Sequence, residues 1–278
     1  MRERETVTQT PLSAADIAAF GGPVPLLRSQ FCATGHVDIP LDKAHPLSGE
    51  ALVDIRDYGI AGESYYHRDD GQNVPYCKQL PGSTPVLRLR KTLAEKLRAV
   101  NRRLAPLGLE LFVWDAYRPI AVQAALWNHF GASLRAQFPQ ASPSMLDAMI
   151  RSYVADPKLA DDSKALTCPN HLTGGSVDLT LRTVASKTHL DMGADFDQMD
   201  DIANTEHFEA ELGKGRISGD DRRLLNRRLL VHVMAAEGFT NHPMEFWHFD
   251  WGNQMHQYVK DLMGGDTRGA AIYGPCHA

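Results

Sequence analysis

Two stretches of the 278-residue sequence, His171-Leu-Thr-Gly-Gly-Ser-Val-Asp178 and Glu245-Phe-Trp-His248, carry most of its information on fold and function. Together they supply two imidazoles and two carboxylates. A catalytic zinc ion takes three protein ligands and leaves a fourth position for water, and His171, Asp178 and His248 suit those three. Glu245 lies three residues before a candidate ligand, where a general base for the water molecule is useful. The pattern predicts a metal-dependent hydrolase.

The glycine pair Gly174-Gly175 removes a geometric objection to this ligand set. On an ideal strand, residues seven apart face opposite sides, so His171 and Asp178 could not reach one ion from the same strand. Two adjacent glycines permit a sharp bend or a bulge between them. Since three residues separate Glu245 from His248, we expect Glu245 at the entry of a strand and His248 inside it.

The composition is that of a globular protein with a sizeable core, because 43% of the residues are hydrophobic and 23% are charged. The formal net charge of -5 is spread along the chain, which argues against a nucleic-acid or anionic membrane partner. No run approaches the ~18 apolar residues of a membrane span. The charged N-terminus does not resemble a secretory signal, and four widely spaced cysteines indicate free thiols. We therefore expect a cytoplasmic protein, and its oligomeric state stays open.

Hydrophobic periodicity and capping residues place the secondary structure. Ser13 to Asp16 reads as a capping box that opens a short helix ending at Gly21-Gly22. Without a regular β-α-β repeat, the order of elements favours the α+β class, with a largely antiparallel central sheet flanked by helices. We expect an accessory N-terminal segment, residues 1–45, packed on a catalytic domain of residues 46–278. The further expected elements are strands over 51–55, 109–114 and 239–250, and helices over 89–104, 120–130, 142–155 and 222–238.

The combination H-x-x-G-x-x-x-D and, far downstream, E-x-W-H resembles the zinc D-Ala-D-Ala metallopeptidase superfamily, and more narrowly its VanX-type D-alanyl-D-alanine dipeptidases. The resemblance runs from about Val53 to about Trp251. It implies a Zn²⁺ cofactor, a zinc D-Ala-D-Ala peptidase-like fold and hydrolysis of a small dipeptide, with D-Ala-D-Ala as the leading substrate. Three further segments agree in order and spacing: Trp114–Pro119, Asp178–Leu181 and Met192–Asp197.

The resemblance also implies roles for residues outside the metal set. Arg118 is either a surface charge paired with Asp115 or, as the resemblance implies, the group that stabilises the oxyanion. Asp197 lies among other acids, as in a solvated loop, but the resemblance places it on the free amino group of the substrate. Such an anion would make the enzyme a dipeptidase instead of an endopeptidase. Asn170 and Tyr117 are further candidate substrate-binding residues, although Tyr117 is equally compatible with packing.

Three departures from the family pattern fall on substrate contacts. Pro169 stands where the family usually carries a serine, and it offers neither a hydroxyl nor an N–H. Thr173 replaces a frequent arginine, and Glu63-Ser-Tyr-Tyr66 occupies the place of an expected D-N-F-x-G segment. Because the metal set is intact, the reaction class is better defined than the substrate. A related cell-wall peptide carboxypeptidase remains an alternative. A non-catalytic zinc-binding module is another, although such a module would tolerate loss of Glu245 or Arg118.

Overall fold

A five-stranded sheet forms the centre of the protein in the computed structural model, which describes residues 20–151, 154–160, 168–265 and 269–276. Its strand order is β2-β4-β5-β7-β6, and only the β2–β4 pair is parallel. The predicted α+β class with a largely antiparallel sheet is confirmed. The strands are β1 (Leu52–Asp54), β2 (Ala61–Gly62), β3 (Arg88–Arg90), β4 (Leu109–Asp115), β5 (Ser176–Thr183), β6 (Thr240–Asn241) and β7 (His248–Asp250), of which β1 and β3 form a separate antiparallel pair.

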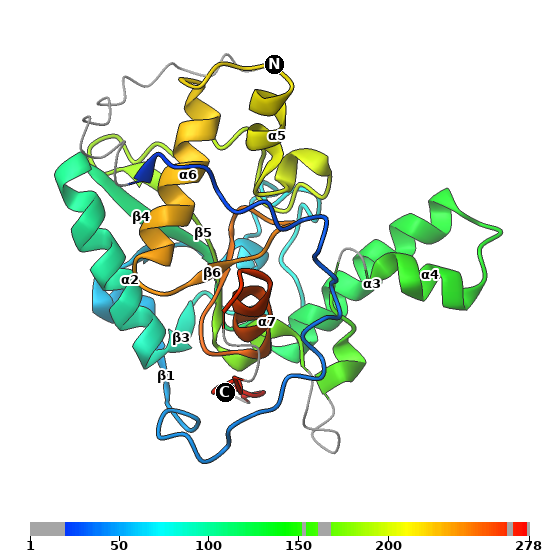
Figure 1. The fold of residues 1–278 in the computed structure, drawn as a ribbon. Coiled ribbons are helices and arrows are strands. Elements are labelled where there is room, and N and C mark those ends of the chain that lie inside the picture. The colour runs from blue at the N-terminus through cyan, green and yellow to red at the C-terminus, as the bar shows by residue number, and fades with distance from the viewer. Residues whose placement is uncertain (1–19, 152–153, 161–167, 266–268, 277–278) are drawn as a thin grey trace.

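Helices flank this sheet, as Figure 1 shows. The expected helix that starts at Ser13 lies outside the described residues. No helix within the described ranges is both long and apolar enough to cross a bilayer. The α-helices are α2 (Lys91–Leu104), α3 (Ile120–Gln137), α4 (Pro143–Ile150), α5 (His207–Gly213), α6 (Arg222–Ala235) and α7 (Gln254–Leu262). The short 3-10 turns include η2 (Tyr65–His67), η3 (Ala105–Leu107) and η6 (Asn170–Thr173).

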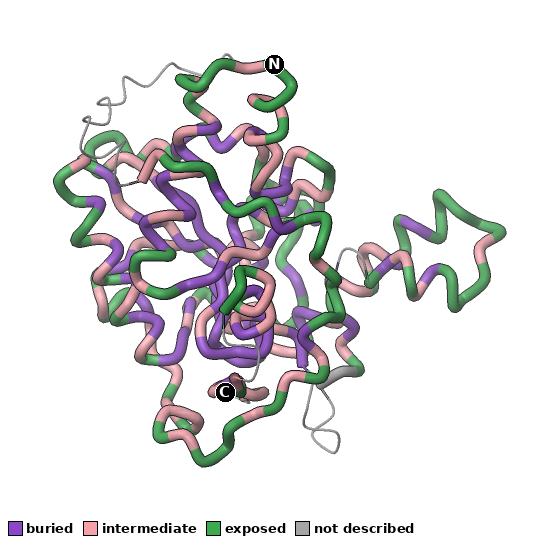
Figure 2. The backbone as a smooth tube through the Cα atoms, viewed as in Figure 1, coloured by how far each residue is buried: buried purple, intermediate pink, exposed green. Residues whose placement is uncertain are grey.

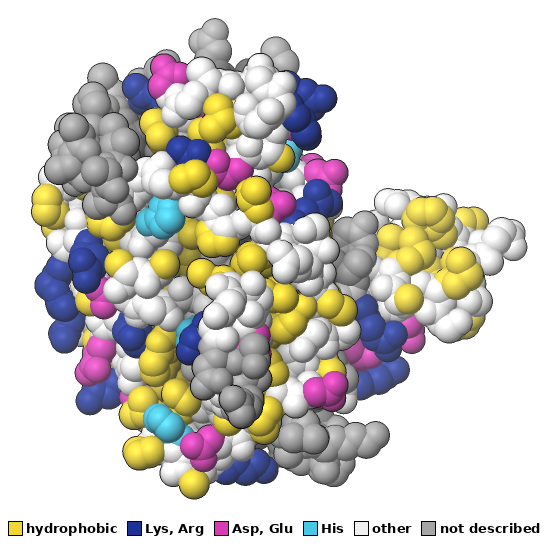
Figure 3. Space-filling view, viewed as in Figure 1, with side chains coloured by type: hydrophobic (Ala, Val, Ile, Leu, Met, Phe, Trp, Pro, Cys, Tyr) yellow, Lys and Arg dark blue, Asp and Glu magenta, His cyan; other side chains and the backbone are white. Residues whose placement is uncertain are grey.

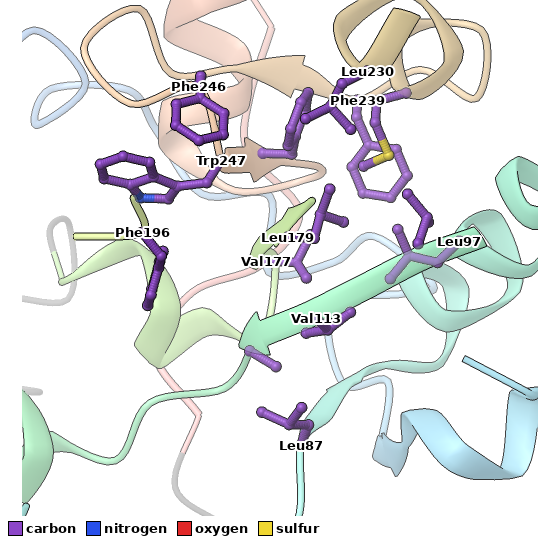
Figure 4. Close-up of a cluster of buried hydrophobic side chains, with 14 of the residues drawn as sticks. Leu87, Leu97, Val113, Val177, Leu179, Phe196, Leu230, Phe239, Phe246 and Trp247 are labelled. Carbon is purple, nitrogen blue, oxygen red and sulfur yellow. The ribbon is translucent and has the colours of Figure 1, made fainter. Parts of the chain in front are cut away.

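The main core lies between the sheet and helices α2 and α6. The expected helix 89–104 and strand 109–114 are confirmed as α2 and β4, which are joined through η3 and Gly108. Alternate residues of β4 are buried, as expected of a strand with one face on the core. Leu97 of α2 and Val113 of β4 are fully buried and lie in the cluster drawn in Figure 4. In Figure 2 the buried backbone is concentrated in this central region.

The expected strand over 239–250 is wrong, because a turn divides it into β6 and β7. Pro243 has no N–H with which to continue a strand ladder. The side chain of Asn241 instead donates hydrogen bonds to the carbonyls of Glu245, Phe246 and His248, at 3.3, 3.2 and 3.0 Å. Glu245 therefore lies in the turn and His248 is the first residue of β7, close to the expected arrangement.

Helices α3 and α4 form an arm that projects from the body (Figure 1). The expected helix 120–130 continues to Gln137, because Gly131 does not end it but makes room for α4. A Cβ at Gly131 would lie 3.2 Å from the side chain of Ile150. The side chain of Ser142 caps α4 as expected, but α4 ends at Ile150 and not near Ala155. Apolar side chains gather on the arm in Figure 3, where Phe138 is 46% exposed.

Residues 20–47, which we call the N-terminal strap, cross the surface over α6 and α7 (Figure 1). Val24 donates its backbone N–H to Glu209 of α5 at 3.0 Å, and Cys32 donates to the hydroxyl of Tyr258 on α7 at 2.9 Å. Near the end of the strap, the backbone N–H of Asp42 donates to the carbonyl of Ala271 at 2.8 Å. These contacts fix the course of the strap, and the division into two parts at residue 45 stays a prediction.

Candidate metal centre and active site

The three predicted metal ligands come from one tight turn and two adjacent strands. His171 lies in η6, which ends at Gly174 in the left-handed conformation, with φ of +69°. Glycine adopts this conformation without steric cost, and the chain then turns directly into β5, which carries Asp178. Asp178 pairs with His248 of β7 in the antiparallel register, so the two side chains share one face of the sheet. The glycine turn thus brings His171 to the strand pair, as the sequence predicted.

The side-chain donors of these residues converge on one point. His248 Nδ1 lies 2.9 Å from Asp178 Oδ1 and 3.1 Å from His171 Nε2. His171 Nε2 lies 3.3 Å from Asp178 Oδ2. All three residues are buried. Among the described residues they form a group of nitrogen and oxygen atoms that could hold a metal ion.

Hydrogen bonds behind both imidazoles fix which nitrogen faces the cluster. His171 Nδ1 lies 2.7 Å from the carbonyl oxygen of Ala116, which can only accept, so Nδ1 carries the proton and Nε2 presents its lone pair. His248 Nε2 lies 3.1 Å from Asp250 Oδ2 and donates to it, which leaves Nδ1 free toward the cluster. Partners of this kind orient metal-binding histidines and raise their basicity.

The carboxylates of the cluster are held in the ionised form. Burial alone would raise the pKa of Asp178, but the imidazoles of His171 and His248 hold it well below its usual range. Asp250 is fully buried and receives hydrogen bonds from Ser176 Oγ at 2.6 Å and Asn253 Nδ2 at 2.7 Å. Burial opposes its ionisation too, yet His248 and these donors keep the pKa of Asp250 below its usual range. The site therefore carries fixed negative charge where a cation would bind.

Glu245 borders the cluster from the turn before β7. Its Oε2 lies 3.8 Å from His248 Nδ1, and 24% of its side chain remains exposed. Burial in the cavity raises the pKa of Glu245 to about 7, because the charged form loses hydration. A carboxylate with a pKa near neutrality can both take up and release a proton, as a general base that later acts as an acid must.

Arg118 is buried beside Asp178 and is not a surface charge. Its Nε donates to Asp115 Oδ2 at 2.8 Å, and its Nη1 donates to Gln123 Oε1 at 3.1 Å. Its Nη2 lies 3.4 Å from Asp178 Oδ2 and 3.3 Å from the hydroxyl of Tyr66. The ion pair with Asp115 that the sequence offered as one alternative is present. This ion pair also orients the Nη2 end of the guanidinium toward Asp178 and the other two proposed metal ligands.

Asp197 is buried, whereas the neighbouring acids Asp195 and Asp200 are exposed. The hydroxyls of Tyr66 and Tyr76 both donate to Asp197 Oδ2, at 2.9 and 3.0 Å. Burial raises the pKa of Asp197 to about 7, against the lowering effect of Arg118. The solvated-loop alternative therefore holds for its neighbours and not for Asp197 itself.

These groups line one cavity of about 130 Å³. Asn170 is part of its wall, in agreement with its prediction as a substrate-binding residue. Tyr117 is not among the described residues that line it. The hydroxyl of Tyr117 instead donates to the carbonyl of Cys276 at 2.9 Å, so the structure places Tyr117 with the C-terminal segment and supports its packing alternative.

Several polar groups of the site were not predicted from the sequence. Asp250 could have been found, because residues two apart on a strand share a face and Asp250 follows His248 at that spacing. Tyr66 falls in the segment that replaces the family's D-N-F-x-G, and Tyr76 lies in an irregular loop. Neither tyrosine belongs to a periodic pattern, so only the three-dimensional structure brings them to Asp197.

A buried cluster of two imidazoles and a carboxylate, with a guanidinium and a second carboxylate at its edge, defines the site of a metal-dependent hydrolase. Residues 78–263 match a family described as D-Ala-D-Ala dipeptidase, which is two thirds of the chain. The chain belongs to this family and is a metallopeptidase.

Curated relatives agree with this assignment. A D-alanyl-D-alanine dipeptidase of Synechocystis is 28% identical over 205 residues, which cover 69% of this chain and 80% of the relative. One from Escherichia coli is 33% identical over 143 residues, which cover 51% of this chain and 55% of the relative. Among solved structures, a vancomycin-resistance D,D-pentapeptidase VanY in complex with Zn(II) aligns with a TM-score of 0.38 at 14% identity. That alignment covers 69% of this chain and 86% of the other.

Proposed function

We propose that this chain is a zinc-dependent dipeptidase that hydrolyses D-Ala-D-Ala, with His171, Asp178 and His248 as the zinc ligands. The convergence of two imidazole lone pairs and one buried carboxylate is the observation that carries this proposal. The family assignment supports the reaction class, and the names of the curated relatives support the dipeptide.

The donor set fits zinc in both chemistry and spacing. Imidazole nitrogen and carboxylate oxygen are ordinary zinc ligands, with bonds of about 2.0–2.2 Å. Ligand atoms at that distance in a tetrahedron lie roughly 3.3–3.6 Å from one another. The two imidazole nitrogens lie 3.1 Å apart, and one ligand atom from each of the three residues lies within 4.8 Å of the others, so small side-chain movements reach this geometry. Two neutral imidazoles and one carboxylate leave the centre with net positive charge.

When bound, zinc would acidify a water molecule and polarise the scissile carbonyl. Glu245 borders the ligand set and takes the proton of the attacking water on its carboxylate. It then delivers this proton to the nitrogen of the leaving amine. Arg118 remains protonated throughout and donates to the carbonyl oxygen as negative charge develops there, because its orientation is already fixed by Asp115 and Gln123.

Asp197 supplies the selectivity for a free amino terminus. Its carboxylate lies at one side of the cavity, and both tyrosine hydroxyls bond the same oxygen, Oδ2. Oδ1 therefore remains available to accept from a substrate ammonium. An acylated amine carries no positive charge and offers fewer protons, so longer peptides and N-acetylated dipeptides bind weakly. This distinguishes a dipeptidase from the carboxypeptidase alternative.

The direct test compares wild type with Glu245→Gln, a substitution that preserves size and removes the base. We expect hydrolysis of D-Ala-D-Ala to fall by ~10²–10⁴-fold, with zinc content measured by elemental analysis and unchanged. Glu95→Gln, at an exposed position of α2, is the matched control and should keep wild-type activity.

Four outcomes would count against the proposal. Full activity in Glu245→Gln removes the proposed base. Absence of zinc from active enzyme removes the proposed cofactor. Zinc-bound wild type that turns over no dipeptide would favour the non-catalytic module, and equal rates on D-Ala-D-Ala and N-acetyl-D-Ala-D-Ala would favour the carboxypeptidase.

A further inference from the structure

The N-terminal strap forms part of the wall of the catalytic cavity. Ala33 and His36 line the cavity together with residues of the metal cluster. The strap lies outside residues 78–263, so this wall is additional to the part of the chain that matches the family. The ring of Phe31 meets that of His242 edge-on, with centroids 4.7 Å apart, and holds the strap against the turn before β7.

His36 is the strap residue with chemistry to offer the cavity. Its side chain is buried, with 8% of the residue exposed. Its Nδ1 is buried and has no hydrogen-bond partner among the described residues, and the same is true of Nδ1 of His242. Buried polar side chains are nearly always paired, so an unpaired one that lines a binding cavity is a position at which a bound molecule can supply the partner.

Asp197 and the strap reach the three proposed ligands through different residues. Asp197 is connected to the cluster through Tyr66 and Arg118, whose guanidinium reaches Asp178. Toward the strap, the ring of His242 packs on that of His248, with centroids 5.3 Å apart. Phe31 of the strap packs on the same His242 ring. A substrate that spans the cluster from Asp197 can therefore extend toward the strap.

A dipeptide is a zwitterion whose carboxylate is at the end opposite its ammonium. The wall offers His36, His242, Asn170 and two arginines as groups that could donate to that carboxylate, and His36 is the one that belongs to the strap. Pro169 has no N–H to donate. Arg118 is assigned to the carbonyl oxygen of the scissile bond, and four of its five N–H groups are held by Asp115, Gln123, Tyr66 and Asp178. The side chain of Arg151 is 46% exposed and pairs with Asp156 at 2.9 Å.

We propose that His36 binds the carboxylate of the dipeptide by donating a hydrogen bond from Nδ1. The inference rests on the proposed dipeptidase function and assigns a substrate contact to the strap. The strap then limits substrate length at the carboxyl end, as Asp197 does at the amino end. The ligand class is a short peptide with a free carboxylate.

The experiment uses the zinc-loaded full chain and compares D-Ala-D-Ala with its C-terminal amide. Wild type should prefer the free acid. In His36→Ala we expect KM for the free acid to rise about 10- to 100-fold, the range for loss of a hydrogen bond to a charged group, while kcat changes much less. The KM for the amide should hardly change, so the preference disappears. Thermal unfolding of each variant checks that the fold is retained.

Two further variants make the test specific to the donor atom. His36→Asn places an amide N–H close to the position of Nδ1 and should restore most of the preference for the free acid. His45→Ala is the matched control in the same strap. His45 Nδ1 accepts from the backbone N–H of Leu47 at 3.2 Å, and His45 does not line the cavity, so this variant should behave as wild type.

Unchanged preference in His36→Ala would overturn the inference while leaving the dipeptidase function intact. Loss of the preference in Arg151→Ala but not in His36→Ala would overturn it in favour of the arginine. A wild type that hydrolyses neither compound would refute the proposed function and the carboxylate contact with it.

Discussion

The substitution Asp197→Asn tests the proposed amine anchor with little structural disturbance. Both tyrosine hydroxyls donate to one carboxylate oxygen, and the amide oxygen of asparagine has two lone pairs with which to accept them. The backbone at Asp197 has φ of +60°, a left-handed conformation that asparagine adopts as readily as aspartate. The substitution therefore removes the negative charge and leaves the position of the side chain unchanged.

Loss of that charge should weaken binding of the substrate ammonium. A hydrogen bond to a charged group contributes about 1.5–3 kcal/mol, which corresponds to a fall in kcat/KM of roughly 10- to 150-fold. The decrease should be confined to substrates with a free amine. We expect N-acetyl-D-Ala-D-Ala to be a poor substrate of the wild type, and its kcat/KM should stay the same or rise in the variant.

The same substitution should stabilise the fold at alkaline pH. Burial raises the pKa of Asp197 from 3.8 to about 7, so the native state holds this proton more tightly than the unfolded chain. The free energy of unfolding therefore falls as the pH rises from about 4 to about 7. Above pH 7 the full pKa shift costs the wild type roughly 4 kcal/mol in free energy of unfolding. A bound cation would reduce this cost. We therefore expect the free energy of unfolding of the variant to be about 1–4 kcal/mol higher than that of the wild type at pH 8.

Steady-state kinetics and thermal unfolding at pH 8, both at one fixed zinc concentration, measure the two effects together. A variant that hydrolyses D-Ala-D-Ala with wild-type kcat/KM would refute the role of Asp197 as anchor. If Asp197→Asn melts at a lower temperature than the wild type at pH 8, the reasoning that the ionised, buried carboxylate of Asp197 destabilises the fold is refuted.

Two more substitutions test how the site is built. Asp250→Ala removes the acceptor behind His248 and should lower zinc affinity about 10- to 100-fold, measured by competition with a chelator; an unchanged affinity would show that the carboxylate does not orient His248. Gly174→Ala forces a side chain into a left-handed residue and within 2.4 Å of Leu52, so we expect a loss of stability of about 1–3 kcal/mol. Gly59 also has a positive φ, but a Cβ added there would meet no atom within 4 Å. Gly59→Ala therefore measures the backbone strain alone, without a steric clash.

The elements with regular hydrophobic patterns were predictable from the sequence. Leucines at helical spacing gave α2, and alternation gave β4, because burial of one face imposes a period on the sequence. The convergence of His171, Asp178 and His248, which we propose as metal ligands, was also predictable, since short motifs fix the residue types and the glycines between the first two allow the turn.

The remaining features depend on contacts that leave no periodic signal. Asn241 ends β6 through side-chain hydrogen bonds to a turn, and these cannot be recognised from the apolar residues around them. The helix expected over 120–130 runs on through Gly131, which allows close packing against α4. Tyr76 and His36 reach the site from irregular segments, where tertiary contacts alone decide their positions.

The strand pairing that places Asp178 opposite His248 makes assembly of the site an all-or-none event. Slippage by a single residue would turn His248 to the far side of the sheet, because successive side chains point in opposite directions. An enzyme with a misaligned β7 would then be inactive outright, with no intermediate level of function. An insertion or deletion between β6 and β7 that shifts the pairing of β7 with β5 should therefore abolish activity.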